Sequence, residues 1–316
     1  MRIVFMGSPE FALPTLRGLI ESDHEIVGVV AQPNRPAGRG RSMRMPPAAA
    51  LAVEHGLALL QPGDINTDDS LEALRTLRPE ALVVAAYGQI MKQPLLDIPA
   101  RGALNVHASL LPRHRGAAPS VGALLAGDDE TGVTIQEVVL KLDAGPIVAQ
   151  RRLAISDDDT TGSLNEKLSV LGAELLIEVL PEWERGEVDA IPQDEEEATF
   201  SASVKRDDAV IDWSMSAVEV WRRVKAYAPW PVATTTVDGE PLRILEAWPA
   251  EAGAGREPGV VIKLPDRSDL PPGAGFAVTC GAGALVIVRA QRAGKRPLSG
   301  AELLRGYSTL MGRRLG

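Results

Sequence analysis

The stretch LNVHASLLPRHRG, residues 104–116, joins the end of an apolar strand to a polar loop that contains arginine, proline and glycine. Side chains alternate between the two faces of a strand, so Asn105 and His107 point to the same side. Two polar groups on one face of a buried strand are costly unless they are paired or used. The stretch therefore predicts a buried sheet in which one strand end carries a site.

The surrounding sequence places this strand in a mostly parallel sheet. Apolar runs without alternation occur at 2–7, 25–32, 57–62, 80–88, 102–109 and 131–138, and amphipathic patterns at 46–56 and 68–78 separate some of them. Such an order predicts an α/β fold, a Rossmann-like sheet with helices on both faces. Ligands of these sheets bind beyond the carboxyl ends of the strands, where Asn105 and His107 lie. Ser8 is predicted to cap the first helix, with Pro9 as its first residue.

The rest of the chain predicts a second domain of another class. A long helical pattern covers residues 160–186, capped by Thr160 or Thr161, and periodicity is then lost over residues 189–208. Short strands at 232–239, 240–249, 258–265, 275–281 and 284–291 follow a helix at 216–228, which indicates a small antiparallel, OB-like β-barrel. We therefore expect a catalytic domain over 1–188, a linker over 189–206 and a β-barrel domain over 207–316.

The composition is that of a globular protein and excludes several kinds of structural site. The 316 residues are 45% hydrophobic and 24% charged, as in ordinary globular proteins. A single cysteine, Cys280, excludes a disulfide framework and a zinc site built on several thiolates. The four histidines do not stand at metal-ligand spacings, so we expect no metal. The apolar start is too short for a signal peptide, and no run reaches 18 apolar residues, so a cytoplasmic location is expected.

Charge is distributed unevenly along the chain. Residues 1–200 hold 17 Lys and Arg against 30 Asp and Glu, whereas residues 201–316 hold 16 against 12. A net-positive second half is compatible with a nucleic-acid partner, although chance sampling gives the same asymmetry as readily.

The polar residues near the strand end suggest acyl-transfer chemistry. The sequence lacks a dinucleotide-binding glycine motif, a Walker loop and a G-x-S-x-G elbow. Asp143 stands in a turn within LKLDAGPIVAQ, residues 140–150, where a lone Asp is usually a turn-former. Together, however, Asn105, His107 and Asp143 suit acyl chemistry without a covalent intermediate. Asn and His can donate hydrogen bonds to an oxyanion, and Asp can orient the imidazole or hold a water.

These motifs carry a family resemblance. NVHASLLPRHRG together with LDAGPI resembles the formyltransferases that use 10-formyltetrahydrofolate as formyl donor. The resemblance implies that Asn105, His107 and Asp143 form the catalytic set and that the amine attacks the formyl carbon directly. It also implies folate contacts from two segments, namely Ser109, Leu110, Leu111 and Pro112, and Tyr87, Gly88, Gln89 and Ile90.

Other stretches resemble the members of this family that formylate methionyl initiator tRNA. AQPNRPAGRGRSMRMPP, residues 31–47, is similar to the insertion with which those members contact the acceptor end of the tRNA. FMGSPEFA, RGAAP, ETGVTI and AYAPWP fit the same members, which also implies a monomer. The tRNA contacts so implied, with Arg39 the best single candidate, are Arg35, Arg39, Arg41, Arg44, Lys205, Arg206, Arg222, Arg223, Lys225, Arg289, Arg292, Lys295 and Arg296.

Two positions depart from the family pattern. His114 stands between two arginines where an aromatic residue is common, and Gln136-Glu137 replaces the usual Met-Gln-Met run. We expect them to affect fine substrate contacts without touching Asn105, His107 or Asp143.

Two alternative functions stay open at this point. One is formylation of a nucleotide-sugar amine, which would need neither the basic insertion nor a basic second domain. The other is an RNA-binding or regulatory protein on a degenerate transferase scaffold, which would have no use for an intact Asn-His-Asp set. Glycinamide ribonucleotide transformylases end near residue 200, and the related hydrolases have other partners.

Overall fold

The computed structural model describes residues 1–37, 42–253, 255–265 and 270–316. They form two compact units, which are described separately. The first comprises residues 1–119, 129–155 and 164–201, and the second comprises residues 120–128, 156–163 and 202–316. Each unit thus contains segments from well-separated parts of the sequence.

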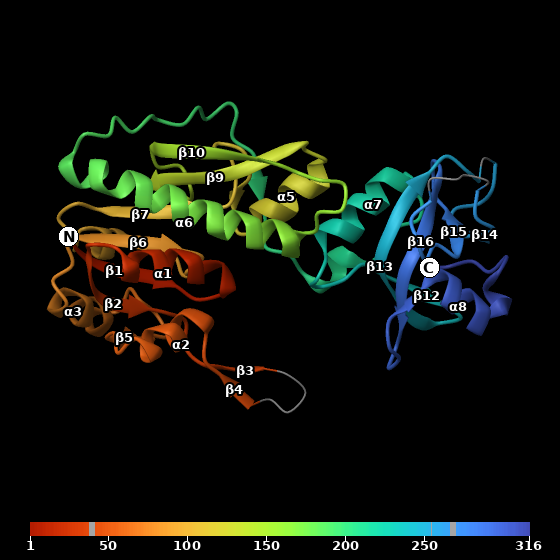
Figure 1. The fold of residues 1–316 in the computed structure, drawn as a ribbon, viewed down its shortest axis with the longest axis horizontal. Coiled ribbons are helices and arrows are strands. Elements are labelled where there is room, and N and C mark those ends of the chain that lie inside the picture. Colours follow the sequence, from red (N-terminus) through yellow and green to blue (C-terminus); the bar gives the residue numbers. More distant parts are fainter. Residues whose placement is uncertain (38–41, 254, 266–269) are drawn as a thin grey trace. The chain divides into compact units, whose positions relative to one another are not determined.

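The first unit is built on a seven-stranded sheet in the order β10-β9-β7-β6-β1-β2-β5 (Figure 1). Strands β5, β2, β1, β6 and β7 are parallel, and β9 and β10 are added antiparallel at one edge. The prediction of a mostly parallel sheet is therefore confirmed. The strands are β1 (Arg2–Gly7), β2 (Glu25–Val30), β5 (Leu59–Leu60), β6 (Ala81–Ala85), β7 (Ala103–His107), β9 (Glu130–Glu137) and β10 (Ile147–Ala154).

The parallel strands have the order of a doubly wound fold. From β1 the chain proceeds outward to β2 and β5, and then returns to β6 on the other side of β1. The carboxyl ends of β1 and β6 therefore flank the point at which the direction of winding reverses, and ligands of such sheets bind there. Strand β7, which carries Asn105 and His107, is the next strand beyond β6.

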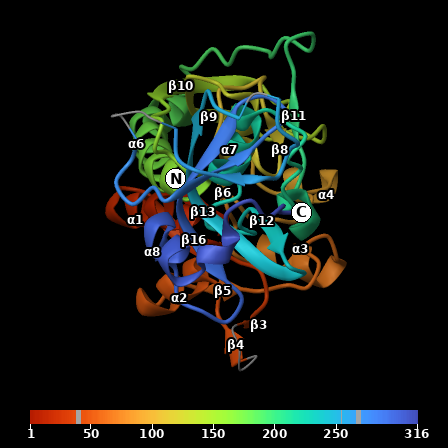
Figure 2. The ribbon, with the colours of Figure 1, turned by 90° about the vertical axis from the view of Figure 1, so that its right-hand side faces the viewer.

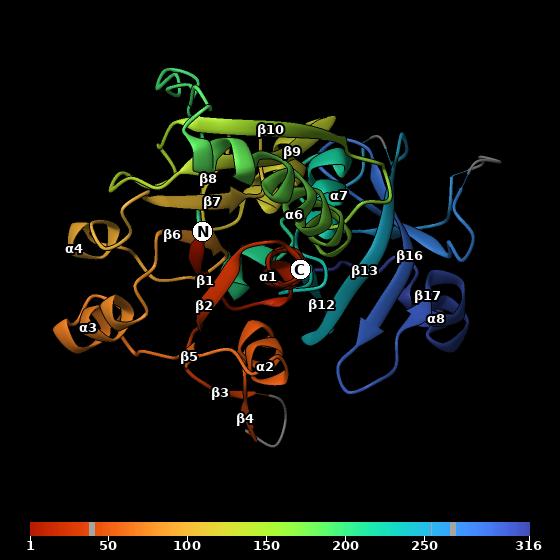
Figure 3. The ribbon, with the colours of Figure 1, turned by 60° about the vertical axis from the view of Figure 1, so that its left-hand side comes forward.

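Different helices cover the two faces of this sheet (Figures 1 and 3). Helix α6 lies against β7 so closely that a Cβ on Gly172 would come within 2.5 Å of Val106 Cγ1. On the other face, Leu71 of α3 and Leu95 of α4 pack in a core that includes Val4 of β1. The helical segments of this unit are η1 (Glu10–Ala12), α1 (Leu13–Glu21), α2 (Pro47–Glu54), α3 (Asp68–Thr76), α4 (Gln93–Leu96) and most of α6 (Thr161–Arg185), whereas α5 (Pro119–Ala126) belongs to the second unit except for its first residue.

Two short pairs of strands complete the first unit. The hairpin of β3 (Arg35–Ala37) and β4 (Ser42–Arg44) lies within the basic insertion. Strand β8 (Arg115–Gly116) pairs in parallel with β11 (Phe200–Ser201), which attaches the segment before residue 201 to this unit. No helix in the described ranges is long and apolar enough to cross a bilayer.

The predicted role of Ser8 as a helix cap is wrong. The first turn is a 3-10 helix preceded by Pro9, with no side-chain cap, and the α-helix begins at Leu13. The Ser8 hydroxyl instead donates to the carbonyl of Tyr87 and accepts from the N–H of Gln32. Ser8 follows β1, Gln32 follows β2 and Tyr87 follows β6, so the Ser8 hydroxyl connects strand ends that are distant in sequence.

The second unit contains an antiparallel half-barrel sheet with the order β12-β13-β16-β15-β14, and β17 pairs with β16 (Figure 2). All its strand pairs are antiparallel, as predicted. Helix α7 begins with a capping box of Ser216 and Glu219. The elements are η2 (Arg206–Ala209), α7 (Ala217–Ala226), β12 (Thr234–Val237), β13 (Glu240–Ala250), β14 (Val261–Ile262), β15 (Phe276–Thr279), β16 (Ala284–Arg292), β17 (Leu298–Ser299), α8 (Gly300–Gly306) and η3 (Ser308–Leu310).

A fully buried phenylalanine lies in the core of the second unit. Phe276 is fully buried and packs among side chains of α7, β13 and β16. Truncating it leaves a cavity that the surrounding sheet cannot fill, so we expect Phe276→Ala to lower the free energy of unfolding by about 3–5 kcal/mol. Urea denaturation followed by tryptophan fluorescence measures the loss. Val210→Ala, at a site that is 61% exposed, serves as control and should change stability by less than about 0.5 kcal/mol. Equal losses in both variants would contradict this account of the core.

Candidate active site

Strand β7 ends at the two polar residues that the sequence singled out. Val106 faces α6, whereas Ala103 packs in the core on the side of α3 and α4. Because side chains alternate along a strand, Asn105 and His107 lie on the side of Ala103. His107 is buried and Asn105 is half-buried. Both polar side chains thus lie near the carboxyl end of a parallel strand.

The His107 ring is oriented by one hydrogen bond. Its Nε2 lies 3.1 Å from the backbone carbonyl oxygen of His114. A carbonyl only accepts, so Nε2 must carry the hydrogen of this bond. The other ring nitrogen, Nδ1, faces Asp143 Oδ1 at 3.7 Å, which is too long for a direct hydrogen bond. Nδ1 is therefore held beside a carboxylate and is still available to another partner.

The amide of Asn105 is the second available polar group. The hydrogen bonds within the described part of the chain do not include its side chain. Strand pairing sets Asn105 opposite Gln136 and His107 opposite Thr134 on β9. The amide of Asn105 and Nδ1 of His107 are thus two potential donors on one face of the sheet, next to a carboxylate.

Asp143 is held in a strained turn by two N–H groups. Its φ of 48° is in the left-handed region, which Asp tolerates better than most residues. The N–H of Gly116 donates to Oδ2 at 2.8 Å, and Nε2 of Gln136 donates to Oδ1 at 3.1 Å. An ionised carboxylate only accepts hydrogen bonds, so both contacts suit a negative charge at this place. The side chain is 14% exposed.

The expectation that the two departures do not touch these residues is wrong. The carbonyl of His114 binds the His107 ring, and the amide of Gln136 binds the Asp143 carboxylate. The reason is tertiary: the pairing of β9 with β7 sets Gln136 beside Asn105, and the loop after β7 folds back over the strand end. The His114 ring itself points away from the catalytic set, toward Ser201.

A buried arginine links this site to the segment of residues 191–201. The side chain of Arg115 is fully buried. Its Nε and Nη2 donate to Oε1 of Gln193, at 3.0 and 2.8 Å, and its Nη1 binds the carboxylate of Glu195. Lys141 also pairs with Glu195. A buried guanidinium needs such acceptors because an unpaired charge is very costly.

Sequence reasoning missed Arg115, Gln136, Gln193 and Glu195 as parts of this site. Residues 193 and 195 lie in the stretch that we expected to serve as linker, because it has no periodicity and carries an acidic run. No local signal marks them, since their partners are about 50 to 80 residues away in the sequence. Arg115 was visible only as one of two arginines in the loop.

The two segments predicted to contact folate are ordered by contacts of their own. In the first, the hydroxyl of fully buried Ser109 donates to the carbonyl of Arg113, and the N–H of Leu111 donates to Thr134. Leu111 is buried and joins Pro112 through a cis peptide bond, with Leu110 only partly exposed beside them.

The second segment follows β6, at the reversal point of the sheet. Tyr87 is buried, and its carbonyl accepts from Ser8 and Gln32. The side chain of Gln89 is bound to the backbone of residues 62 and 65. Gly88 and Ile90 are exposed, and Ile90 at 78% is an unusually open aliphatic side chain. Folate contacts from this segment stay a prediction.

The predicted tRNA-binding cations lie in several places. Arg35 and Arg44 are paired across the β3–β4 hairpin and are exposed, while Arg39 and Arg41 lie outside the described residues. In the second unit, Lys205, Arg206, Arg289 and Lys295 are exposed. The other predicted cations already have contacts within this unit. Arg223 hydrogen-bonds Tyr227, and Arg296 forms an ion pair with Glu302. Lys225 and Arg292 stack over the rings of Trp221 and Tyr307, and Arg222 lies against Gly127.

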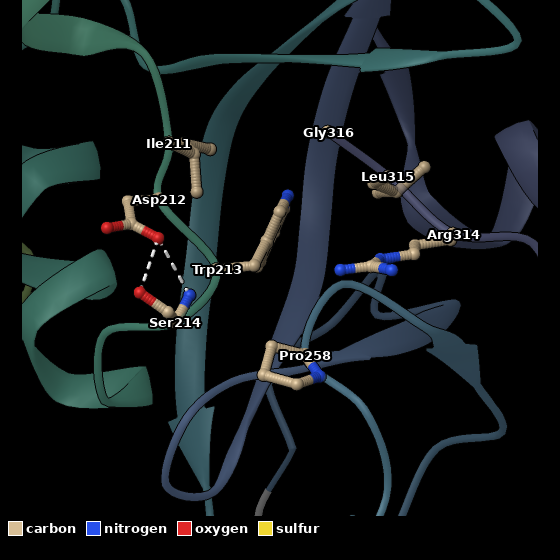
Figure 4. A pocket seen from close by; sticks show the side chains of 8 residues that line it. All are labelled: Ile211, Asp212, Trp213, Ser214, Pro258, Arg314, Leu315 and Gly316. Carbon is tan, nitrogen blue, oxygen red and sulfur yellow. Dashed lines mark hydrogen bonds between the residues drawn. The ribbon is translucent and has the colours of Figure 1, made fainter.

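An open pocket of about 550 Å³ lies in the second unit, near residues 314–316 (Figure 4). Its polar side chains already have partners. Asp212 accepts from Ser214, Trp213 donates to Thr235, and Arg314 pairs with Glu257. The pocket does not contain the catalytic set, whose three residues all belong to the first unit.

Sequence comparisons match the whole chain to one family. Residues 1–180 match the family described as formyl transferase, and residues 203–308 match its C-terminal domain. Methionyl-tRNA formyltransferase of Methylococcus capsulatus is 46% identical over 316 residues, which cover 100% of both chains. The enzyme of the same name from Bacillus velezensis is 41% identical over 100% of this chain and 98% of its own.

Comparison of structures finds the same fold at lower identity. A sugar 3N-formyl transferase, WlaRD, solved with dTDP and 5-N-formyl-THF, superposes with a TM-score of 0.67 at 15% identity, covering 94% of this chain and 99% of that one. HypX from Aquifex aeolicus in complex with tetrahydrofolic acid gives 0.63 at 22% identity, covering 96% of this chain and 47% of HypX.

The ion pairs of Glu195 make the stability of this site depend on pH. Hydrogen bonds from Arg115, and then from Lys141, lower the pKa of Glu195 from its ordinary 4.5 to about 2. Since the folded pKa is below the unfolded one, Glu195 stabilises the fold above about pH 4.5, and this contribution is lost as the pH falls toward 2. We expect wild type to have a higher Tm than Glu195→Gln at pH 6, with the gap closing below pH 4.5. The half-exposed carboxylate makes the gap small and sensitive to salt. A gap that does not change between pH 6 and 3 would contradict this assignment.

Proposed function

Because the chain belongs to the formyl transferase family, over both of its matched domains, we propose that the site at the end of β7 transfers a formyl group to the α-amine of methionyl initiator tRNA. The formyl donor is a folate derivative, and we propose 10-formyltetrahydrofolate. The product, N-formylmethionyl-tRNA, serves translation initiation. Such a role fits a cytoplasmic monomer, which we include in the proposal.

One observation carries the chemical part of the proposal. The Asn105 amide and His107 Nδ1 are both left available for a ligand, and Asp143 lies 3.7 Å from that nitrogen. Two N–H donors on one side of a sheet edge can bind an oxygen on which negative charge develops. A carboxylate beside them can hold a water and accept a proton through it.

The proposed reaction needs no covalent enzyme intermediate. The neutral amine of the methionyl group attacks the formyl carbon, a C–N bond forms, and the formyl oxygen becomes an oxyanion. The amide of Asn105 donates a hydrogen bond to that oxygen, and so does Nδ1 of His107 in the ring form that carries a hydrogen on both nitrogens, while Nε2 stays bound to His114. A water held by Asp143 moves the proton of the amine to the departing N10 as its bond to carbon breaks. Formylmethionyl-tRNA and tetrahydrofolate leave.

The tRNA part of the proposal rests on charge. Exposed arginines on the β3–β4 hairpin, together with the cations of the second unit, would meet phosphates of the tRNA. The division into a catalytic domain over 1–188, a linker over 189–206 and a tRNA-binding domain over 207–316 belongs to this proposal. Transfer to a nucleotide-linked amino sugar in place of methionyl-tRNA, in a direct assay of both acceptors, would overturn it.

Substitution of the proposed oxyanion donors tests their role in the reaction. Removing one such donor typically lowers kcat about 10²–10³-fold, and we expect losses of that size for Asn105→Ala and His107→Ala. The test measures formylation of methionyl-tRNA with 10-formyltetrahydrofolate, with circular dichroism to show that both variants fold. Gln93→Ala, an exposed substitution on α4, serves as control. Wild-type turnover by either donor variant would exclude its assigned role.

Substitution of arginines in the basic insertion, residues 31–47, tests its role in tRNA binding. Arg39→Ala and Arg44→Ala should each raise the KM for methionyl-tRNA and leave the KM for the folate unchanged, because the lost contacts are to phosphate. Each loss should reduce the salt slope of tRNA binding by about one. Steady-state kinetics and binding over a salt series measure both effects. Arg75→Ala removes an exposed arginine of α3 that pairs with Glu72, and it controls for net charge. If this control weakens tRNA binding equally, the insertion has no special role.

A further inference from the structure

We propose that Gln193 is a positioning residue for the reaction, which fixes the Asp143 turn at its working distance from His107. The inference rests on the function proposed above. Gln193 is 50 residues from Asp143 in sequence, and its hydrogen bonds within the described residues go to neither Asn105 nor His107. It acts through hydrogen bonds to the backbone of the turn and to a buried arginine.

Both the nitrogen and the oxygen of the Gln193 side-chain amide are fully hydrogen-bonded. Its Nε2 donates to the carbonyls of Asp143 and Gly145, at 2.8 and 2.7 Å. Its Oε1 accepts two bonds from the guanidinium of Arg115. Two donors and two acceptors satisfy a side-chain amide in full. The carbonyls can only accept and the guanidinium can only donate, so these partners also fix which end of the amide is nitrogen.

These bonds connect the groups that hold the Asp143 carboxylate. Arg115 precedes Gly116, whose N–H donates to Oδ2 of Asp143. Gln136, which donates to Oδ1, has its own Oε1 3.3 Å from Nε2 of Gln193. One amide therefore contacts the backbone of the Asp143 turn and both structures that supply donors to its carboxylate.

The turn needs such a restraint. Asp143 has a positive φ, a backbone conformation that is strained for a residue other than glycine. Gly145 approaches β9 so closely that a Cβ on it would come within 1.7 Å of the carbonyl oxygen of Glu137. A strained turn held only at its ends can relax. Relaxation would move the carboxylate away from Nδ1 of His107.

Two substitutions distinguish the hydrogen bonds of the Gln193 amide nitrogen from those of its amide oxygen. Gln193→Met keeps the length of the side chain and removes every hydrogen bond of the amide. Gln193→Glu keeps an acceptor for Arg115, which protects folding, but sets an oxygen against the two carbonyls of the turn. For both variants we expect kcat to fall about ten- to a hundredfold, with KM for methionyl-tRNA and for 10-formyltetrahydrofolate within about twofold of wild type. Gln93→Met is the matched control, since among the described residues the side-chain amide of Gln93 hydrogen-bonds only Asp97, directly after α4.

A double-mutant cycle distinguishes positioning from general stability. In an Asp143→Asn background, whose turnover is already impaired, Gln193→Met should lower single-turnover formylation by less than about twofold, because the group that it positions is absent. The same loss in both backgrounds would overturn the inference and leave the proposed function intact. Absence of formylation by the wild-type chain would overturn the proposed function itself.

Discussion

The contact between the Asp143 carboxylate and the His107 imidazole is the interaction on which the site depends. Neither side chain can be left in a closed environment without partners, because buried polar and charged groups are costly. The fold supplies these partners from three directions: Gly116 and Gln136 bind the carboxylate, and the carbonyl of His114 binds the ring. Within the described residues, the amide of Asn105 has no hydrogen bond, and Nδ1 of the ring has only the 3.7 Å contact with Asp143, so both can bind a ligand.

The arrangement of the sheet explains why this contact forms at the end of β7. Parallel strands bring their carboxyl ends to one edge, and the reversal of winding beside β1 leaves room for a ligand there. Strand β9 then pairs antiparallel with β7, which sets Gln136 beside Asn105 and brings the chain back to Asp143 within seven residues. The strand pairing thus brings the candidate catalytic residues near one another, and contacts from Gly116 and Gln193 hold the Asp143 turn in place.

The segment of residues 191–201 shows how a region without periodicity can have a defined place. Its side chains supply the acceptors that the buried guanidinium of Arg115 requires, and β11 pairs with β8. The acidic run in this segment looks like solvated linker, yet Glu195 belongs to an ion-pair network. Its charge contributes to the site because Arg115 is buried beside it.

The sequence by itself determined most of the strands and the family of the chain, and it pointed to the candidate site residues. Apolar runs gave the strands of the first sheet, closely spaced turns gave the antiparallel strands of the second, and the alternation in LNVH placed Asn105 and His107 on one face. These properties are local, since they depend on residues within one strand or turn. Only the tertiary structure decided that Ser8 links strand ends, that Gln136 and His114 support the catalytic set, and that Gln193 binds the Asp143 turn. Those roles depend on pairs separated by up to 79 residues, and hydrogen bonds between such pairs leave no pattern in the sequence around either partner.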